Sequence, residues 1–362
     1  MAVGRPLRNG SSVGWEGEGL GIKELARHLN ISIGTVSRAL NGHPEVNAET
    51  RKRVLEAAAA LGYAPDQAGR SLRQGTLNVV ALLLSTDLTS KTDTMFFMEL
   101  SRGIQDQFAE HGLDLVIHLN KPGMDMLDRV KRIVERRQAD ALILAETRDD
   151  DPRLDYLAGR GFPFATMGRS WSGGSHPWMD LDFDSAMRAA IDRLAGFGHR
   201  RVALVTGDPG YMLDSMLRDA YRRELAGHDL AVDEALMIKA DTHEEGGYRA
   251  MTDFLAMSAP PTAVIFPHYR AVVGAYACLA EAGLQPGRDV AILSCSADTT
   301  IAQFMAPPLT CFRLDLYGLG GRLAQALLAS MPRFAESYGS ALVQEIWPWE
   351  LIGRDSDGFR VG

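Results

Sequence analysis

The chain is poor in cysteine and contains no long apolar run, and these two absences exclude several classes of protein. Only Cys278, Cys295 and Cys311 occur among 362 residues, and no two lie within four residues of each other. The sequence therefore predicts neither a disulfide framework nor a cysteine-based metal clip. No stretch reaches the roughly 18 apolar residues of a membrane span, and the N-terminal residues lack the apolar core of a signal peptide. We expect a protein of the reducing cytoplasm with no membrane partner.

Fingerprints of nucleotide-binding enzymes are also missing. The glycine-rich run at residues 17–21 precedes a predicted helix but follows no predicted strand, and the run at 318–321 lies within a helical pattern. Neither position suits a dinucleotide-binding turn, and no P-loop occurs. We therefore expect no enzyme activity, no catalytic residue, no metal and no cofactor.

What the chain does contain is an ordinary globular composition with an uneven charge. Hydrophobic residues make up 46%, charged residues 23% and aromatic residues 7%, and the net charge is −8. Residues 1–75 hold ten cations against seven acids, so they carry +3 and the remainder carries −11. A basic head on an acidic body is typical of a DNA-binding module fused to a second domain. The length suits such a small domain followed by a larger, two-lobed one.

Three short helices are predicted between residues 22 and 61. Ser32 is placed to cap the second helix, over residues 33–40, and Asn47 to cap the third. Apolar residues recur at helical spacing, and we expect the inward faces to consist of Ile22, Leu25, Ala26, Leu29, Val36, Ala39, Leu40, Val54, Leu55, Ala58 and Leu61.

Two helices joined by a short turn and braced by a third form a helix-turn-helix, whose second helix enters the major groove of DNA. The outward face of residues 33–40 carries small and hydrogen-bonding side chains, which phosphates do not repel. Arg38 can donate two hydrogen bonds to a guanine edge. The periodicity alone leaves open a plain three-helix bundle with a solvated polar face.

Residues 66–75 form a short segment with Leu72 flanked by Arg70 and Arg73. A helix of this length is marginal in water, because few hydrogen bonds offset its nucleation. It is either a hinge helix that orders against DNA or a partner copy, or a plain linker.

From residue 77 onward, apolar β-type runs alternate with helical patterns over about 280 residues. This alternation predicts a doubly wound α/β body in two lobes, with a ligand crevice at the carboxyl ends of the strands. Buried parallel strands are predicted at 79–84, 113–118, 141–144, 163–167, 202–205, 263–266 and 290–293. The intervening helices are predicted at 96–111, 126–137, 183–197, 213–226, 244–257, 270–282 and 316–329.

Three segments of the helical head form a specific pattern: IKELARHLNISIGTVSRALN at residues 22–41, VNAET at 46–50 and LGYAP at 61–65. They resemble the headpiece of the lactose-repressor (LacI/GalR) family of bacterial transcription regulators. The similarity covers residues 20–353 and continues in the body through Phe96-Phe97, Asp182, Gly198-His199-Arg200, Thr262-Ala263, Gly274 and Pro307-Pro308-Leu309-Thr310.

The resemblance implies a homodimer or tetramer that binds a pseudo-palindromic operator in double-stranded DNA through two headpieces. It also implies that Leu72 of the hinge helix wedges into the minor groove. Gly69 stands where the family favours alanine, which weakens that helix by roughly 1 kcal/mol. Pattern and resemblance together predict DNA contacts from Ser32, Ile33, Gly34, Thr35, Ser37, Arg38, Asn41, Asn47, Thr50, Tyr63 and Leu72.

In this family the body resembles a periplasmic sugar-binding protein and holds a small effector, usually a carbohydrate, between its lobes. An effector that prefers one conformation of the body changes operator affinity by linkage. The effector contacts that we predict here are Phe96, Phe97, Trp171, Arg218, His268, Tyr269 and Asp298.

The effector itself is not identified by this pattern. His268 and Tyr269 replace the family's Asn-Asp pair. Leu217 stands where the family has an arginine, and Ala297 stands where it has an aspartate. These departures disfavour a simple hexose and leave open a larger glycoside or a charged sugar derivative.

The predicted fold is thus a small all-α helix-turn-helix headpiece plus an α/β two-lobed, periplasmic-binding-protein-like domain with doubly wound parallel sheets. The expected segments are a disordered arm at 1–19, the headpiece at 20–64, the hinge at 65–76, the effector-binding and dimerisation body at 77–353 and a tail at 354–362. The expected function is an allosterically controlled repressor. The alternatives are a cytoplasmic small-molecule-binding or enzymatic α/β body with a vestigial headpiece, and a sugar-binding transport component.

Overall fold

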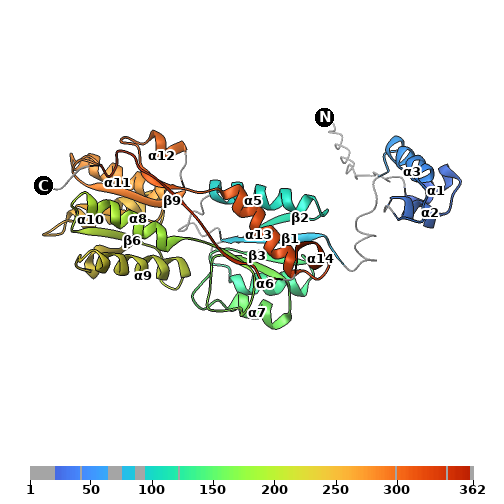
Figure 1. The fold of residues 1–362 in the computed structure, drawn as a ribbon, viewed down its shortest axis with the longest axis horizontal. Coiled ribbons are helices and arrows are strands. Elements are labelled where there is room, and N and C mark those ends of the chain that lie inside the picture. The colour runs from blue at the N-terminus through green and yellow to red at the C-terminus, as the bar shows by residue number, and fades with distance from the viewer. Residues whose placement is uncertain are drawn as a thin grey trace, which may run out of the picture. The chain divides into compact units, whose positions relative to one another are not determined.

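The computed structural model describes residues 21–40, 43–63, 76–85, 94–120, 123–297, 300–339 and 341–358. The chain divides into two compact units, Met1–Leu77 and Asn78–Gly362 (Figure 1). Within the described segments, no helix combines the length and apolarity needed to cross a membrane. The expected arm at 1–19 and most of the expected hinge, including Leu72, lie outside the described residues.

The first unit contains the three helices predicted from periodicity, α1 (Ile22–Leu29), α2 (Ile33–Leu40) and α3 (Ala48–Ala60). Their buried residues form one small core of Leu25, Ala26, Val36, Ala39, Val46, Val54 and Ala58. Leu55 was predicted to face inward, and this is wrong, because the side chain is 49% exposed. Leu55 follows the buried Val54 directly, and successive helical residues point about 100° apart.

The second unit has two lobes, each with a six-stranded sheet. In lobe 1 all strand pairs are parallel, and the order is β11 (Gln344–Trp347), β5 (Trp178–Leu181), β4 (Phe164–Met167), β3 (Ala141–Leu144), β1 (Val79–Ser85) and β2 (Asp114–Asn120). Helices α5 (Thr94–Ala109) and α13 (Leu316–Ser330) cover one face, and α6 (Met126–Glu135) and α7 (Pro152–Arg160) cover the other (Figure 1). The short α14 (Ala335–Tyr338) follows α13.

In lobe 2 the order is β12 (Glu350–Ile352), β10 (Thr310–Arg313), β9 (Ala291–Ala297), β8 (Ala263–Phe266), β6 (Val202–Thr206) and β7 (Met237–Lys239). All pairs are parallel except β10 with β12. Helices α8 (Phe183–Gly196) and α9 (Met212–Gly227) pack on one face, and α10 (Glu244–Leu255) and α11 (Tyr269–Glu281) on the other. A 3-10 turn (Glu234–Leu236) precedes β7, and α12 (Thr300–Phe304) follows β9.

The chain passes between the lobes three times. The crossings lie between β5 and α8, between β10 and α13, and between β11 and β12. One continuous apolar core extends from the α5 and α13 side of lobe 1 to the α8 and α9 side of lobe 2. The doubly wound, two-lobed architecture is therefore confirmed.

Two details differ from expectation. The segment 113–118 was predicted to be a buried strand, but β2 is the edge of its sheet, and Val116, Ile117 and Leu119 are exposed. The first part of the expected tail is also structured, since Ser356 and Asp357 are fully buried in lobe 2. Asp357 accepts hydrogen bonds from Arg193 Nη2 at 3.0 Å and Thr310 Oγ1 at 2.7 Å, which hold residues 354–358 against the sheet.

Candidate functional site

The outward face of α2 is the first candidate site. Ser32 Oγ accepts a hydrogen bond from the Thr35 amide at 3.0 Å, so Ser32 caps the helix as its residue type predicts. Val36 and Ala39 are buried on the inner side. The residues Ile33, Gly34 and Arg38 are exposed on the other side, whereas Thr35 and Ser37 are half-buried. This face is small and polar around one exposed guanidinium, as a helix that approaches DNA bases requires.

The start of α3 supplies further candidate contacts. Asn47 Oδ1 accepts a hydrogen bond from the Thr50 amide at 2.7 Å, which makes Asn47 the helix cap. Arg51 Nη2 donates to His43 O at 2.7 Å and fixes the turn that precedes the cap. Tyr63 is half-buried against the headpiece core. The predicted contact Asn41, like Leu72, lies outside the described residues.

A cleft of about 350 Å³ between the two lobes is the second candidate site. Lobe 1 lines it with Phe96 and Phe97 of α5 and with residues that follow β3 and β4. Lobe 2 lines it with residues that follow β6, β7 and β8. The carboxyl ends of parallel strands are where open α/β sheets bind ligands, and the volume lies in the usual range of roughly 300–1,000 Å³.

Most charged groups of the cleft are engaged in ion pairs. On lobe 1, Arg169 Nε donates to Asp180 Oδ2 at 2.7 Å. Burial raises the pKa of the Asp180 carboxyl, and the hydrogen bond and charge of Arg169 counter that effect only in part. On lobe 2, Lys239 pairs with Asp208, and the hydrogen bond that its ammonium group donates to this carboxylate raises the pKa of the ammonium.

Aromatic rings at the lobe crossings form another wall of the cleft. Trp349, on the third crossing, packs edge-on against Phe183 and Phe312 with centroid distances of 5.2 and 5.6 Å. Trp349, Phe183 and Leu314 of the second crossing all line the cleft. A ligand in the cleft therefore contacts the segments that must move if the lobes change their angle.

One lip of the cleft is closed by contacts between the lobes. The residues after β3 meet the start of α9 through main-chain hydrogen bonds, from Asp149 N to Gly210 O at 3.1 Å and from Met212 N to Thr147 O at 3.0 Å. Both lobes thus contribute backbone groups to this lip, and the described conformation is closed there.

Only some of the predicted effector residues line this cleft. Phe96, Phe97 and His268 do, and Asp298 lies outside the described residues. His268 also caps α11, because its Nδ1 accepts the Arg270 amide at 3.2 Å.

The other three predicted effector contacts need correction. Arg218 points to its own lobe, where it donates to Asp214 Oδ2 at 2.8 Å and to Thr206 Oγ1 at 2.6 Å. Tyr269 is only 6% exposed and belongs to the core of lobe 2. Trp171 is 77% exposed and does not line the cleft.

Sequence reasoning missed the polar and aromatic lining residues Arg169, Asp180, Asp208, Tyr211, Lys239 and Trp349. Arg169, Asp208 and Lys239 lie within two residues of a strand's carboxyl end, and that position is the signal that would have identified them.

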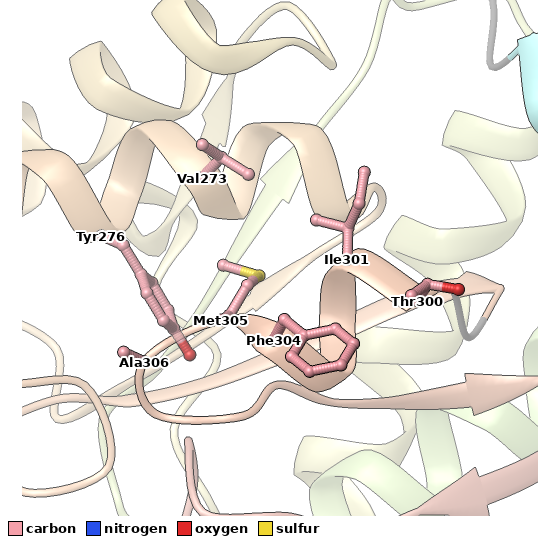
Figure 2. A pocket seen from close by; sticks show the side chains of 7 residues that line it. All are labelled: Val273, Tyr276, Thr300, Ile301, Phe304, Met305 and Ala306. Carbon is pink, nitrogen blue, oxygen red and sulfur yellow. The ribbon is translucent and has the colours of Figure 1, made fainter.

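Helices α11 and α12 form a separate, shallow apolar groove on lobe 2. Figure 2 shows Val273 and Tyr276 of α11 facing Ile301 and Met305, with Phe304 beside them. Phe304 is 83% exposed and Ile301 is 49% exposed, which is unusual for side chains of this size.

Comparison with known protein families accounts for both units. The family described as bacterial regulatory proteins, lacI family, matches residues 21–66, and a periplasmic binding protein-like domain matches residues 191–356. The HTH-type transcriptional regulator AglR of Rhizobium meliloti (strain 1021) is 34% identical over 343 residues, covering 93% of this chain and 94% of that protein. The HTH-type transcriptional regulator RafR of Escherichia coli is 32% identical over 275 residues, covering 76% and 80%.

Solved structures agree with this fold. The lac repressor dimer bound to operator and the anti-inducer ONPF superposes with a TM-score of 0.79 at 20% identity, covering 94% of this chain and 99% of that chain. The complex of the regulator CelR with cellobiose gives a TM-score of 0.70 at 24% identity, covering 93% and 99%. The headpiece, the two-lobed body and the relatives across nearly the whole length lead to one conclusion: the chain belongs to the LacI family of bacterial transcriptional regulators.

Proposed function

We propose that this protein is a repressor that binds a pseudo-palindromic operator as a homodimer and leaves it when a saccharide occupies the interlobe cleft. The observation that carries the proposal is the pairing of an exposed, Arg38-bearing face on α2 with a ligand-sized cleft at the strand ends of the body. An effector that binds one lobe arrangement more tightly than the other shifts operator affinity by that difference, so no catalytic step is involved.

A saccharide is the effector that the cleft walls favour. Aromatic rings such as Phe97, Phe183 and Trp349 suit the C–H faces of sugar rings, and the carboxylates and cations suit hydroxyl groups. The CelR structure, which shares this fold, is a complex with cellobiose. We propose the same class of ligand, a saccharide, for this chain, and we name no particular sugar.

Two exposed apolar patches support a second copy as partner. Met95 and Met98 of α5 and Leu119 of β2 are each about 60% exposed on lobe 1. Phe304 and the groove of Figure 2 are exposed on lobe 2. Helices α5, α11 and α12 and strand β2 lie along the same edge of the body in Figure 1. Apolar patches of this kind mark protein interfaces, and a symmetric dimer presents the two headpieces that an inverted repeat requires.

Selection of binding sites from a random double-stranded DNA pool tests the proposal. The purified full chain is used at a stated salt concentration near 150 mM, because phosphate contacts make affinity depend strongly on salt. Recovery of an inverted repeat is expected, followed by its release when a panel of mono-, di- and trisaccharides is added. Enrichment of single half-sites would contradict the dimer, and a palindrome that no saccharide releases would contradict the effector class.

A further inference from the structure

The charged groups that line the described part of the cleft are unequal in number. Two cations, Arg169 and Lys239, face five carboxylates, those of Glu146, Asp180, Asp208, Asp214 and Asp241. Both cations already have a carboxylate partner in their own lobe, Asp180 for Arg169 and Asp208 for Lys239. The lining thus offers an incoming anion a net negative surface.

Two of the remaining carboxylates, those of Asp214 and Asp241, are held by arginines that do not line the cleft. Asp214 accepts from Arg218 at 2.8 Å, and Asp241 accepts from Arg249 at 2.8 Å. Asp214 is only 3% exposed and also accepts the Gly207 amide at 3.0 Å. These arginines hold the acidic side of the cleft in place and present no free cationic surface to a ligand there.

Arg169 is the cation best placed to hold a ligand. Its Nε is fixed by Asp180, its guanidinium lies 5.8 Å from the Trp178 ring, and its Nη2 lies 3.4 Å from Met216 Sδ of lobe 2. Among the described residues, none accepts a hydrogen bond from Nη1. Arginine has five N–H donors, so a ligand oxygen can accept from this guanidinium while Asp180 keeps its own bond.

The cleft binds an anionic ligand less favourably than a neutral one. An anion that accepts from Arg169 or Lys239 lies beside the carboxylate that already pairs with that cation, so two like charges share one cation. Asp180 is only 4% exposed, and burial already raises the pKa of its carboxyl, so little water screens this repulsion. A hydroxyl or ring oxygen accepts the same hydrogen bond without a second negative charge.

From these contacts we propose that the cleft selects saccharides without an anionic group over their phosphorylated or uronic acid forms, with Arg169 as the donor that anchors the sugar. The inference rests on the proposed saccharide effector and adds the charge class and the anchoring residue. It decides between the two effector types that the sequence left open, in favour of an uncharged glycoside.

Calorimetric titration of the full chain with matched pairs of ligands tests the charge class. Cellobiose, maltose, sucrose and trehalose are each compared with their 6-phosphates, and galactose and glucose with galacturonate and glucuronate. We expect binding only among the neutral members, with each anionic counterpart at least tenfold weaker. An anionic member that binds as tightly as its neutral counterpart would overturn the inference and leave the saccharide effector standing.

Substitution of the anchor tests Arg169. Arg169→Lys keeps a cation beside Asp180 but loses the guanidinium fork, so we expect about a tenfold loss of affinity for the neutral sugar. Arg222→Lys is the matched control, because Arg222 pairs with Glu234 at 3.0 Å away from the cleft lining. Operator affinity without sugar reports the integrity of both variants. Equal sugar affinity in Arg169→Lys and wild type would remove Arg169 from the inference.

The remaining outcomes separate the inference from the proposed function. If a neutral sugar binds but does not release the operator, the inference stands and the allosteric step of the proposed function fails. If no saccharide of either class binds, the saccharide effector and the inference are both overturned.

Discussion

Ser215 Oγ donates a hydrogen bond of 2.7 Å to Asp149 Oδ2 and so links the start of α9 in lobe 2 to the segment after β3 in lobe 1. This bond adds to the two main-chain hydrogen bonds at the same lip. The lobes are therefore held at the lip as well as by the three crossings. A change of lobe angle must break these contacts, and their strength helps to set the balance between the closed and open forms.

Removal of the Ser215 hydroxyl is expected to loosen the lip. A hydrogen bond contributes roughly 0.5–1.5 kcal/mol, so in Ser215→Ala the amides of Asp149 and Met212 should exchange with deuterium several-fold faster. Ser330→Ala is the control, because it removes a hydroxyl that donates to Leu327 O within α13. Mass-spectrometric hydrogen exchange measures both. Unchanged exchange at the lip in Ser215→Ala would show that the side-chain bond does not hold it.

Arg38 is expected to determine base preference. Arg38→Ala should lower affinity for the selected operator by roughly ten- to a hundredfold and flatten the preference at one base pair of each half-site. Arg53→Ala, at an exposed position of α3, is the control and should leave the pattern of preference intact. Gel-shift titrations against single-base variants measure both effects. A full base preference in Arg38→Ala would show that another residue reads the operator.

The headpiece was predictable because its signals are local. Ser32 and Asn47 cap helices through bonds to residues three positions on, and such short-range chemistry is visible in a sequence. Fully apolar strands such as β3 and β8 were likewise predicted with their observed bounds. Strand β5, which has the same length, was missed because it includes Asp180, a charged residue that is buried beside its partner Arg169. Helix α7 was missed because a proline such as Pro152 is typical of the first turn of a helix and also of a chain break between elements.

The cleft was only partly predictable, for a physical reason. Which side chains face a ligand depends on how two lobes meet, and residues far apart in the sequence supply the walls. Arg218 was predicted to contact the effector because it lies next to Leu217, where the family has an arginine. Asp214, one helical turn earlier, instead holds the Arg218 guanidinium within lobe 2. Tyr269 begins α11 and turns into the core, whereas the preceding His268 faces the cleft.

The apolar edge of the body should control assembly. Phe304→Asp places a charge in the groove of Figure 2, and burying it in an interface is costly, so the dimer should dissociate at protein concentrations where wild type does not. Val232→Asp is the control, because Val232 is 41% exposed outside both patches. Sedimentation velocity measures the shift. A dimer of unchanged affinity in Phe304→Asp would place the interface elsewhere.

The ion pair between Arg193 and Asp357 should contribute strongly to stability. Asp357 is fully buried, and breaking such a pair by removing one charge costs roughly 3–5 kcal/mol. Asp357→Asn should therefore lower the free energy of unfolding by about that amount in urea titrations. Asp219→Asn, which removes a largely exposed partner of Arg222, should change it by less than about 1 kcal/mol. Equal effects of the two substitutions would show that residues 354–358 contribute little to the stability of lobe 2.

The thiol of Cys295 should be unreactive in the native protein, although Cys295 lines the cleft. Burial raises the pKa of its thiol to about 12, so at pH 8 roughly one molecule in ten thousand carries the reactive thiolate. The charged form is disfavoured only in the folded chain, and unfolding returns the pKa to its ordinary value near 8.5. Cys278 and Cys311 are also buried. Ellman's reagent at pH 8 should therefore label none of the three thiols in the native protein and all three in guanidinium. One fast-reacting thiol in the native protein that Cys295→Ser abolishes would show that the cleft opens widely without an effector, because only an opened cleft exposes that sulfur to the reagent.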